Sequence, residues 1–401
     1  MKEITFEDAE EVLTLGYNKY NNTGIGQGLF YDCPLEKVSL GRNLSYRKNS
    51  SYGYSPFINI KSLKYLTIGD YVTTIGEYLF SNCVGLVEIR IPSNVISIKS
   101  CAFYSCKGLN TISISEGVTS IGNYTFENCR NLQVTTIPQS ITSIGDSVFT
   151  GCTGELVVKC NIPNGAFCGS KFAKVHIGEH VSSIGDSSFK GCSSLTSLSV
   201  PNNVTFIGNS AFQDCSGLTS LAMGEGLTSI GDSSFKGCSS LTSLSVPNNV
   251  TFIGNSAFSG CSALTSITIP QSVTEIGSSA FDNCTSIKEL VIADGRELLS
   301  IGCNASNEGL FHDCPLRKVY IGRNLNNAYD FSPFPINVKL LSLTFGNNVT
   351  SISNYMLYGV YVLTSVTIPD NVVSIGDYAF SNCIYNHRTT KTNQKYPSVN
   401  L

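Results

Sequence analysis

The sequence lacks tryptophan, contains only 3 methionines and 4 histidines, and is poor in charge. Charged residues make up 14% of the 401 residues, against about 25% in ordinary soluble domains. The net charge of −3 and the pI of about 5.9 do not give the basic footprint of a nucleic-acid-binding protein. No run of 18 apolar residues occurs, so we expect no membrane span in this chain.

The amino-terminal segment, MKEITFEDAEEVLTLG, has no basic stretch followed by an apolar one, and therefore does not predict a secretory signal peptide. It aligns instead with the interior segment IKELVIADGRELLSIG, because Lys2 matches Lys288 and Gly16 matches Gly302. We expect the chain to begin in the middle of a repeat, either as a fragment of a longer protein or as a product that has lost its leader.

A period of 23 residues runs through most of the chain. It is marked by a phenylalanine, replaced once by leucine, at Phe80, Phe103, Phe126, Phe149, Phe189, Phe212, Phe235, Phe258, Phe281, Phe311, Phe334, Leu357 and Phe380. The surrounding pattern is L-x-x-I-x-I-P-x-x-V-x-x-I-G-x-x-A-F-x-x-C, as in LTSITIPQSVTEIGSSAFDNC from Leu264 to Cys284. A fixed period of this length is typical of stacked repeats that bury their apolar faces against one another.

The pattern within one repeat predicts its local structure. Ile267 and Ile269 alternate with small polar residues, which indicates a half-buried strand. Pro270 has no N–H for a strand ladder and ends it, and Gly277 permits a tight bend. Asp, Asn or Ser then follows, which favours the N-cap of a short helical turn. Parallel strands need such a crossover. We therefore predict a right-handed leucine-rich repeat solenoid with about 23 residues per coil.

We expect about sixteen coils over residues 1–385, with Phe30, Phe57 and Phe167 in the less regular ones. The interval from Phe149 to Phe167 is only 18 residues long, which indicates a shortened coil. Residues 386–401 are polar and aperiodic, and are predicted to form a disordered tail or a thin cap. The segment GLFYDCPLEKVSLGRNL at positions 28–44 returns in similar form at positions 309–325.

Twelve of the sixteen cysteines stand three residues after the repeat phenylalanine position. Disulfides and zinc binding are possible interpretations. However, one cysteine per coil places neighbouring thiols in parallel, whereas a disulfide needs convergent Cβ vectors. A ladder of buried free thiols fits the spacing better. Four cysteines lie off this ladder, and the short coil can bring two of them, Cys160 and Cys168, together; the others are Cys101 and Cys303.

The repeat resembles the BspA type of leucine-rich repeat, which is found in bacterial surface proteins and in some parasitic protists. The resemblance extends from about Lys2 to Cys383 and rests on the iterated motif I-P-x-x-V-x-x-I-G-x-x-A-F-x-x-C. It implies a curved solenoid displayed outside the cell, with binding of host or matrix proteins reported for some members, and it offers no catalytic residues to transfer.

No catalytic constellation emerges from the residues, and we expect no enzyme activity, no cofactor and no metal site. His176 and His180 form H-x-x-x-H within KVHIGEHV, but the repeat places them on a strand and its following turn and not on one helix face. The repeat pattern around the ladder cysteines supplies no histidine that would activate a nucleophile.

Tyrosines are confined to the two end regions of the sequence, whereas the central repeats have small polar residues on their predicted strand face. All nineteen tyrosines lie at or before Tyr124 or at or after Tyr320. On the predicted strand face, Ser197 and Ser199 are typical of the centre, whereas larger side chains stand toward the ends. The insertion RNLSYRKNSSYGYSPF at positions 42–57 is rich in Tyr and Arg, which are enriched in interface hot spots. The candidate binding residues are Tyr46, Arg47, Tyr52, Tyr54, Tyr65, Arg90, Lys318 and Tyr320. A flexible polar loop without a binding role is the alternative.

The sequence and the resemblance together predict a non-enzymatic cell-surface or secreted protein that binds a host, matrix or other protein through its solenoid surface. The alternative is a carbohydrate-binding or scaffold part of a larger surface protein, because tyrosine faces can stack on sugars. Glycan and protein ligands therefore both remain candidates at this point.

Overall fold

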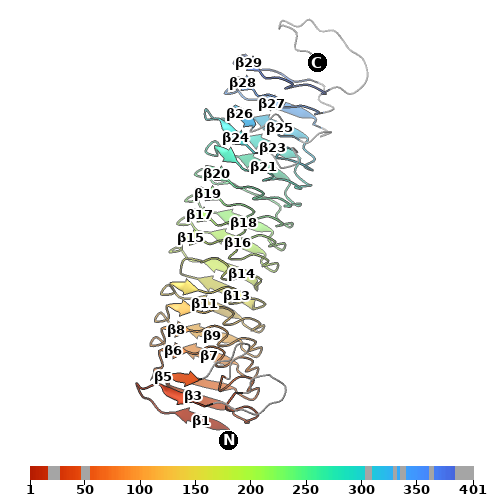
Figure 1. Cartoon of the computed structure of the whole chain (residues 1–401). Coiled ribbons are helices and arrows are strands. Elements are labelled where there is room, and N and C mark those ends of the chain that lie inside the picture. Colours follow the sequence, from red (N-terminus) through yellow and green to blue (C-terminus); the bar gives the residue numbers. More distant parts are fainter. Residues whose placement is uncertain are drawn as a thin grey trace. The chain divides into compact units, whose positions relative to one another are not determined.

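The structure, a computed structural model, describes residues 1–16, 28–46, 55–302, 309–327, 332–334, 340–360 and 365–383. The chain divides into two compact units, Met1–Asn203 and Val204–Leu401. Each unit is a stack of coils with parallel strands, as Figure 1 shows. Residues 23 apart face each other in neighbouring coils, as in the pairing of Ser120 with Ser97 and with Ser143. The predicted leucine-rich repeat solenoid with coils of about 23 residues is confirmed.

The first unit has one longer and one shorter strand in most of its coils. The longer strands are β1 (Glu3–Phe6), β3 (Lys37–Arg42), β5 (Tyr65–Tyr71), β7 (Glu88–Ile91), β9 (Thr111–Ile114), β11 (Val134–Ile137), β13 (Thr153–Val158), β14 (Lys171–Ile177) and β16 (Ser197–Val200). The shorter ones are β2 (Leu13–Leu15), β4 (Leu44–Tyr46), β6 (Thr74–Ile75), β8 (Ser97–Ile98), β10 (Ser120–Ile121), β12 (Ser143–Ile144) and β15 (Ser183–Ile184). Within the unit, β1, β3 and β5 form one sheet. A second sheet contains β7, β9, β11, β13, β14 and β16, and the short strands form separate sheets.

The second unit repeats this arrangement. Its longer strands are β18 (Ser220–Met223), β21 (Ser266–Ile269), β23 (Glu289–Ile292), β25 (Lys318–Ile321) and β27 (Ser342–Phe345). Its shorter strands are β17 (Phe206–Ile207), β19 (Ser229–Ile230), β20 (Phe252–Ile253), β22 (Glu275–Ile276), β24 (Leu299–Ile301), β26 (Leu325–Asn327), β28 (Ser351–Ile352) and β29 (Ser374–Ile375). The sheet β21–β23–β25–β27 and the sheet from β17 to β26 are parallel throughout.

The alternation of apolar and polar residues sets the faces of the longer strands. In β9, Ile112 and Ile114 are buried while Thr111 and Ser113 are not, because successive side chains of a strand point to opposite sides. The proline that follows the strand then starts a turn. In the coil after β7, for example, the N–H of Val95 donates to the carbonyl oxygen of Pro92 at 3.2 Å. The chain then enters the short strand β8.

The third side of each coil is a turn, and here one prediction is wrong. Among the described residues the structure has strands and turns but no helix. Most turns begin and end with a residue in the left-handed conformation, such as Cys101 (φ 57°) and Ser105 (φ 56°). A left-handed residue interrupts a right-handed helix. The main-chain N–H groups of Cys101, Phe103 and Ser105 instead donate to carbonyl oxygens of the next coil at 2.7–3.0 Å.

The polar residue after the repeat glycine therefore does not cap a helix. Its side-chain oxygen accepts a hydrogen bond from the N–H at the same place in the next coil. Asn123 Oδ1 accepts from the N–H of Asp146 at 3.0 Å in the first unit, and Asn255 Oδ1 accepts from the N–H of Ser278 at 2.8 Å in the second. These side chains join neighbouring coils, which explains why Asp, Asn and Ser recur at this position.

The repeat glycine also has a different role from the predicted one. A Cβ atom added to Gly277 would lie 2.5 Å from the backbone nitrogen of Asn255, and one added to Gly145 would lie 2.5 Å from the backbone nitrogen of Asn123. No real Cβ atom tolerates such a distance. The glycine is needed because two coils approach each other closely at this point.

The repeat phenylalanines form the centre of the core in both units. In the first unit the rings of Phe57, Phe80, Phe103, Phe126 and Phe149 stack with centroids 5.3–5.6 Å apart. In the second, the stack runs through Phe212, Phe235, Phe258, Phe281, Phe311 and Phe334 with spacings of 5.3–6.3 Å. Stacked aromatic pairs contribute about 0.5–1.5 kcal/mol each beyond the burial of their area.

The cysteine ladder follows the phenylalanine stack. Most of the ladder thiols donate a hydrogen bond to the main-chain carbonyl oxygen at the repeat phenylalanine position of the preceding coil, over 3.0–3.4 Å. The pairs include Cys83 with Phe57, Cys106 with Phe80, Cys129 with Phe103, Cys152 with Phe126, Cys261 with Phe235 and Cys284 with Phe258. All described cysteines, including Cys101, Cys160 and Cys168, are free thiols; Cys303 lies outside the described residues.

The short coil is accommodated by an irregular strand. Between β13 and β14 the register shifts at Gly154 and Glu155, and in place of a short strand a single bridge joins Ile162 to Ile184. The domain prediction, a solenoid over residues 1–385 with about sixteen coils, stays a prediction. The tail predicted for residues 386–401 lies outside the described residues.

Candidate binding surfaces

The exposed side of the longer strands carries two of the predicted binding residues in the first unit. Tyr65 on β5 is 62% exposed, and Arg90 on the next longer strand, β7, is also exposed. Tyr65 faces Lys37 of β3 in the parallel register, and Arg90 faces Ser113 of β9. The burial of the alternate residues in β7 fixes this orientation. Tyr65 and Arg90 thus project from strands of successive coils on the same side.

Salt bridges between successive strands occupy part of the same side. Lys37 Nζ lies 2.6 Å from Glu3 Oε1, and Lys174 Nζ lies 2.9 Å from Glu155 Oε1. The hydrogen bond and charge of Lys174 hold the pKa of the Glu155 carboxyl below its usual range. His176 adds a further contact, 3.8 Å from Glu155 Oε2. These exposed pairs stabilise the fold little, because water and salt screen them, but they fix which charges this side presents.

The predicted residues of the second unit, Lys318 and Tyr320, both lie on β25 and engage the preceding coil. Lys318 Nζ is 2.9 Å from Glu289 Oε1. The Tyr320 hydroxyl donates to Asp294 Oδ1 at 2.8 Å, and this hydrogen bond raises the pKa of Tyr320. Both side chains are therefore positioned by carboxylates of their own unit.

Tyr46, at the end of β4, is held against the solenoid. Its hydroxyl donates to the carbonyl oxygen of Glu77 at 2.7 Å, and it covers Gly76 so closely that a side chain there would clash. Burial raises the pKa of the Tyr46 hydroxyl, and the charge of Glu77 raises it further. Tyr46 therefore ties the end of β4 to the next coil. The other predicted residues of the insertion, Arg47, Tyr52 and Tyr54, lie outside the described residues.

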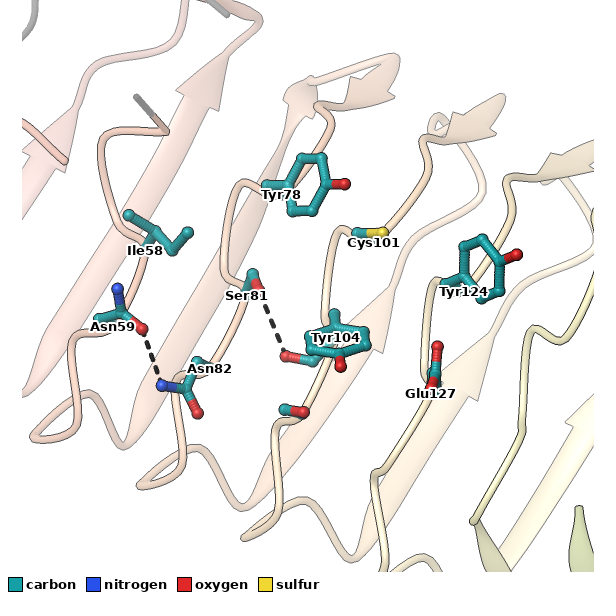
Figure 2. Close-up of a pocket in the computed structure, with 10 residues that line it drawn as sticks. Ile58, Asn59, Tyr78, Ser81, Asn82, Cys101, Tyr104, Tyr124 and Glu127 are labelled. Atoms are coloured by element: carbon teal, nitrogen blue, oxygen red, sulfur yellow. Dashed lines mark hydrogen bonds between the residues drawn. The ribbon is translucent and has the colours of Figure 1, made fainter. Parts of the chain in front are cut away.

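A groove that the sequence analysis missed lies along the turns of the first unit. Its volume is about 570 Å³, within the range of small-ligand sites. Three successive coils contribute their first left-handed turn residue: Tyr78 (φ 55°), Cys101 (φ 57°) and Tyr124 (φ 57°). Figure 2 shows the two tyrosines on either side of the much smaller cysteine. We call this place the tyrosine groove.

The rest of the tyrosine groove comes from the far ends of the same turns. Tyr104 and Glu127 stand one residue after the repeat phenylalanines of two successive coils, and Tyr104 lies beside Cys101 in Figure 2. Asn59, Asn82 and Ser105 form a polar margin, in which the Asn82 amide donates to Asn59 Oδ1 at 2.7 Å. The groove thus combines three aromatic rings with amide and carboxylate groups.

One carboxylate, that of Glu127, lines the tyrosine groove and gives it a negative charge. Burial raises the pKa of Glu127, whose Oε1 accepts a hydrogen bond from the Asn128 amide at 3.4 Å. Burial also raises the pKa of the Cys101 thiol; a hydrogen bond with Tyr78 lowers it, and the charges of Glu77 and Glu127 raise it further. Cys101 therefore stands within the electrostatic reach of both acids.

The second unit has tyrosines at equivalent turn positions, but they contact each other. Tyr355 and Tyr378 are the first left-handed residues of successive turns, and their rings stack with centroids 4.9 Å apart. Tyr358 meets the ring of Tyr355 edge-on at 5.6 Å. In the first unit Cys101 interrupts the equivalent column, which leaves room between Tyr78 and Tyr124.

The described residues show no cluster of three or more His, Cys, Asp or Glu side chains that would suit a metal ion. His312, on a turn of the second unit, lies near two carboxylates: its Nδ1 is 2.9 Å from Asp282 Oδ1 and 3.7 Å from Asp313 Oδ2. Within the same part of the chain, no helix is long and apolar enough to cross a membrane.

Comparison with known families matches the BspA type leucine rich repeat region, in 6 copies, over residues 2–60, 50–157, 160–288 and 263–387. The fold is similar to that of a leucine-rich repeat protein from Bacteroides ovatus ATCC 8483, with a TM-score of 0.53, 21% identity, and coverage of 82% of this chain and 92% of that one.

Two further solved structures match with lower TM-scores. A leucine rich cell surface protein from Faecalibacterium prausnitzii A2-165 has 24% identity, a TM-score of 0.39, and coverage of 72% of this chain and 87% of that one. The pneumococcal vaccine antigen PcpA has 17% identity, a TM-score of 0.40, and coverage of 94% and 86%. None of the curated proteins matches. The repeat matches extend over nearly the whole sequence, and the chain therefore belongs to the BspA type leucine-rich repeat family.

Proposed function

We propose that the chain is a non-enzymatic surface protein that binds a protein ligand through exposed side chains of its solenoid. Membership of the BspA type leucine-rich repeat family supports a protein-interaction or surface role, and leucine-rich repeat proteins are generally not enzymes. We further propose, by the same family resemblance, that the protein acts at the cell surface or in the secreted fraction, with a host or extracellular-matrix protein as its ligand.

The observation that carries this proposal is the exposure of Tyr65 and Arg90 on successive strands of the first unit. A tyrosine side chain that is 62% exposed contributes little to the core, so the fold itself does not require it. Tyr and Arg are the residue types that most often dominate protein interfaces. By contrast, β16 of the same unit presents only Ser197 and Ser199 on its exposed side.

The insertion remains part of the proposal. The Tyr46 hydroxyl donates a hydrogen bond to the carbonyl oxygen of Glu77 and so anchors the beginning of the insertion. We therefore assign Tyr46 the role of positioning the insertion and not of contacting the ligand. We propose that Arg47, Tyr52 and Tyr54 also contribute to binding of the ligand, and that Lys318 and Tyr320 form a smaller surface in the second unit.

The test is binding of the purified chain to a panel of immobilised extracellular-matrix and host-surface proteins. Tyr65→Ala with Arg90→Ala should abolish saturable binding, and the triple change Arg47→Ala, Tyr52→Ala and Tyr54→Ala should weaken it. Surface substitutions of this kind change stability by less than about 0.5 kcal/mol, so thermal unfolding should hardly change.

The matched control is Ser197→Ala with Ser199→Ala, on the same side of the same unit. If the serine pair abolishes binding and the Tyr65 and Arg90 pair does not, the binding surface is elsewhere on the strands. Absence of saturable binding across the panel would contradict the proposed ligand class. A glycan array that gives the only specific signal would favour the carbohydrate alternative.

A further inference from the structure

We propose that the tyrosine groove of the first unit binds an arginine side chain of a protein or peptide ligand. This inference rests on the proposed function, because it supplies one recognition element for a protein ligand. It concerns a different side of the coils from Tyr65 and Arg90, since the groove lies on the turns and those residues lie on the longer strands.

The first argument is the composition of the groove. Tyr78, Tyr104 and Tyr124 place three aromatic rings around one space of about 570 Å³. A guanidinium group is attracted to the face of a tyrosine ring and can stack on it because it is planar. Tyr124 is 43% exposed, so its ring is accessible to a ligand.

The second argument is charge complementarity. The carboxylates of Glu77 and Glu127 both act on the Cys101 thiol between the two outer tyrosines. Burial raises the pKa of Glu127, which means that its charged form is poorly solvated in the free protein. A bound cation would compensate for this. A guanidinium fork can form paired hydrogen bonds with a carboxylate, whereas a neutral sugar cannot neutralise its charge.

The third argument is the space at Cys101. Tyr78, Cys101 and Tyr124 occupy the same turn position in three successive coils, with φ angles of 55–57°. Where two tyrosines are consecutive at this position, as Tyr355 and Tyr378 are, the rings stack on each other and leave no gap between them. A cysteine in the middle coil therefore creates the opening, and a tyrosine there would close it.

The experiment uses the full chain and two short peptides, Ac-Gly-Gly-Arg-Gly-Gly-amide and its neutral citrulline analogue, each measured by solution binding at low ionic strength. We expect binding of the arginine peptide and no measurable binding of the citrulline peptide. Glu127→Gln and Tyr124→Ala should each weaken binding at least about fivefold, as expected for loss of a charge-assisted hydrogen bond or a cation–π contact.

The decisive variant is Cys101→Tyr, which should abolish binding by filling the groove. The conformation at this position accepts tyrosine, as Tyr78 and Tyr124 show. Ser187→Tyr is its control, because it introduces a tyrosine at the equivalent turn position outside the groove, and it should bind as the unchanged chain does. Glu179→Gln and Tyr71→Ala remove an exposed carboxylate and an exposed tyrosine outside the groove and should have no effect.

Three results would overturn the proposal: equal binding of both peptides, arginine binding that Cys101→Tyr leaves intact, and binding of neutral oligosaccharides only. If Cys101→Tyr does not fold, Glu127→Gln and Tyr124→Ala decide the question. Because the peptides are tested directly, the groove can fail while the Tyr65 and Arg90 surface still binds its protein ligand. The reverse outcome is equally visible, so the two failures can be told apart.

Discussion

The thiol of Cys106 lies 3.2 Å from the main-chain carbonyl oxygen of Phe80 in the preceding coil and donates a hydrogen bond to it. The same relationship recurs in both units, so the cysteines join coils without covalent bonds. A disulfide would instead require the sulfurs of two cysteines to meet in a specific geometry, and all the described ladder cysteines are free thiols.

We therefore predict that the ladder thiols are reduced in the folded protein. Titration with a thiol reagent in denaturant, without added reductant, should detect at least the twelve ladder cysteines of the sixteen in the sequence. In the native protein most should react slowly, because the ladder thiols of the described residues are mainly buried. Recovery of only a few thiols after unfolding would contradict the ladder.

The ladder also predicts a loss of stability at alkaline pH. Burial raises the pKa of Cys106, Cys152 and Cys238 from the ordinary 9.0 to about 12. Between these values the unfolded chain releases protons that the folded chain keeps, so the free energy of unfolding falls as the pH rises from about 9 to about 12. Below about pH 9 these thiols are protonated in both states, and their contribution is constant.

The measurement is urea unfolding at about pH 8 and about pH 10.5, compared with the variant Cys106→Ala. Each thiol contributes at most about 1.4 kcal/mol per pH unit. Cys106→Ala is less stable at neutral pH but should lose less stability on alkalinisation. An identical pH dependence of the two proteins would contradict the raised pKa of Cys106.

Gly145→Ala should destabilise the first unit by about 1–3 kcal/mol, the usual cost of an overpacked site. The added methyl group would lie 2.5 Å from the backbone nitrogen of Asn123, so the two coils would have to separate. Gly16→Ala is the matched control, because a Cβ atom there meets nothing within 4 Å. Thermal unfolding of the two variants measures the difference, and equal stability would show that the coils yield at little cost.

Arg323 supports a further prediction in the second unit. Its guanidinium is fully buried and donates to the carbonyl oxygens of Gln271 at 2.8 Å and Pro270 at 2.9 Å, more than fifty residues earlier. Burial lowers the pKa of this arginine. Arg323→Ala leaves both carbonyl oxygens without these donors and should cost about 2–4 kcal/mol, since each lost partner costs about 1–3 kcal/mol.

The duplicated GRNL sequence supplies the control for Arg323. Arg42 holds the equivalent place in the first copy but is only partly buried, and its Nε donates to the carbonyl oxygen of Glu7 at 2.9 Å. Arg42→Ala should cost less than about 1 kcal/mol. Hydrogen exchange at residues 270–272 would localise the effect of Arg323→Ala, and an equal loss in both variants would remove the distinction.

The spacing of residues was enough to predict the strands, the coils of about 23 residues and the cysteine ladder, because burial follows a fixed period in the sequence. It was not enough to predict the turns. A cap residue before Ala-Phe predicts a helix locally, yet the structure satisfies the N–H groups between coils, and such contacts do not follow from one repeat alone.

The tyrosine groove had a signal in the sequence that the analysis did not use. Tyr78, Cys101 and Tyr124 are spaced by the repeat period, as are Tyr355 and Tyr378. Their shared position was visible, but whether their side chains enclose a space depends on the left-handed turn conformation, which the periodicity does not reveal. The exposure of Tyr65 and Arg90 could be predicted because strand alternation alone determines which side they face; their binding role stays a prediction.

The left-handed turn residue has one more consequence, for how such a chain can change over generations. Ser, Tyr and Cys all occupy this position with φ between 52° and 57°, and its backbone hydrogen bonds run to the next coil whatever the side chain is. One substitution here can therefore alter what a partner meets without disturbing the stack of coils. New specificities can arise at single codons while the scaffold is inherited unchanged.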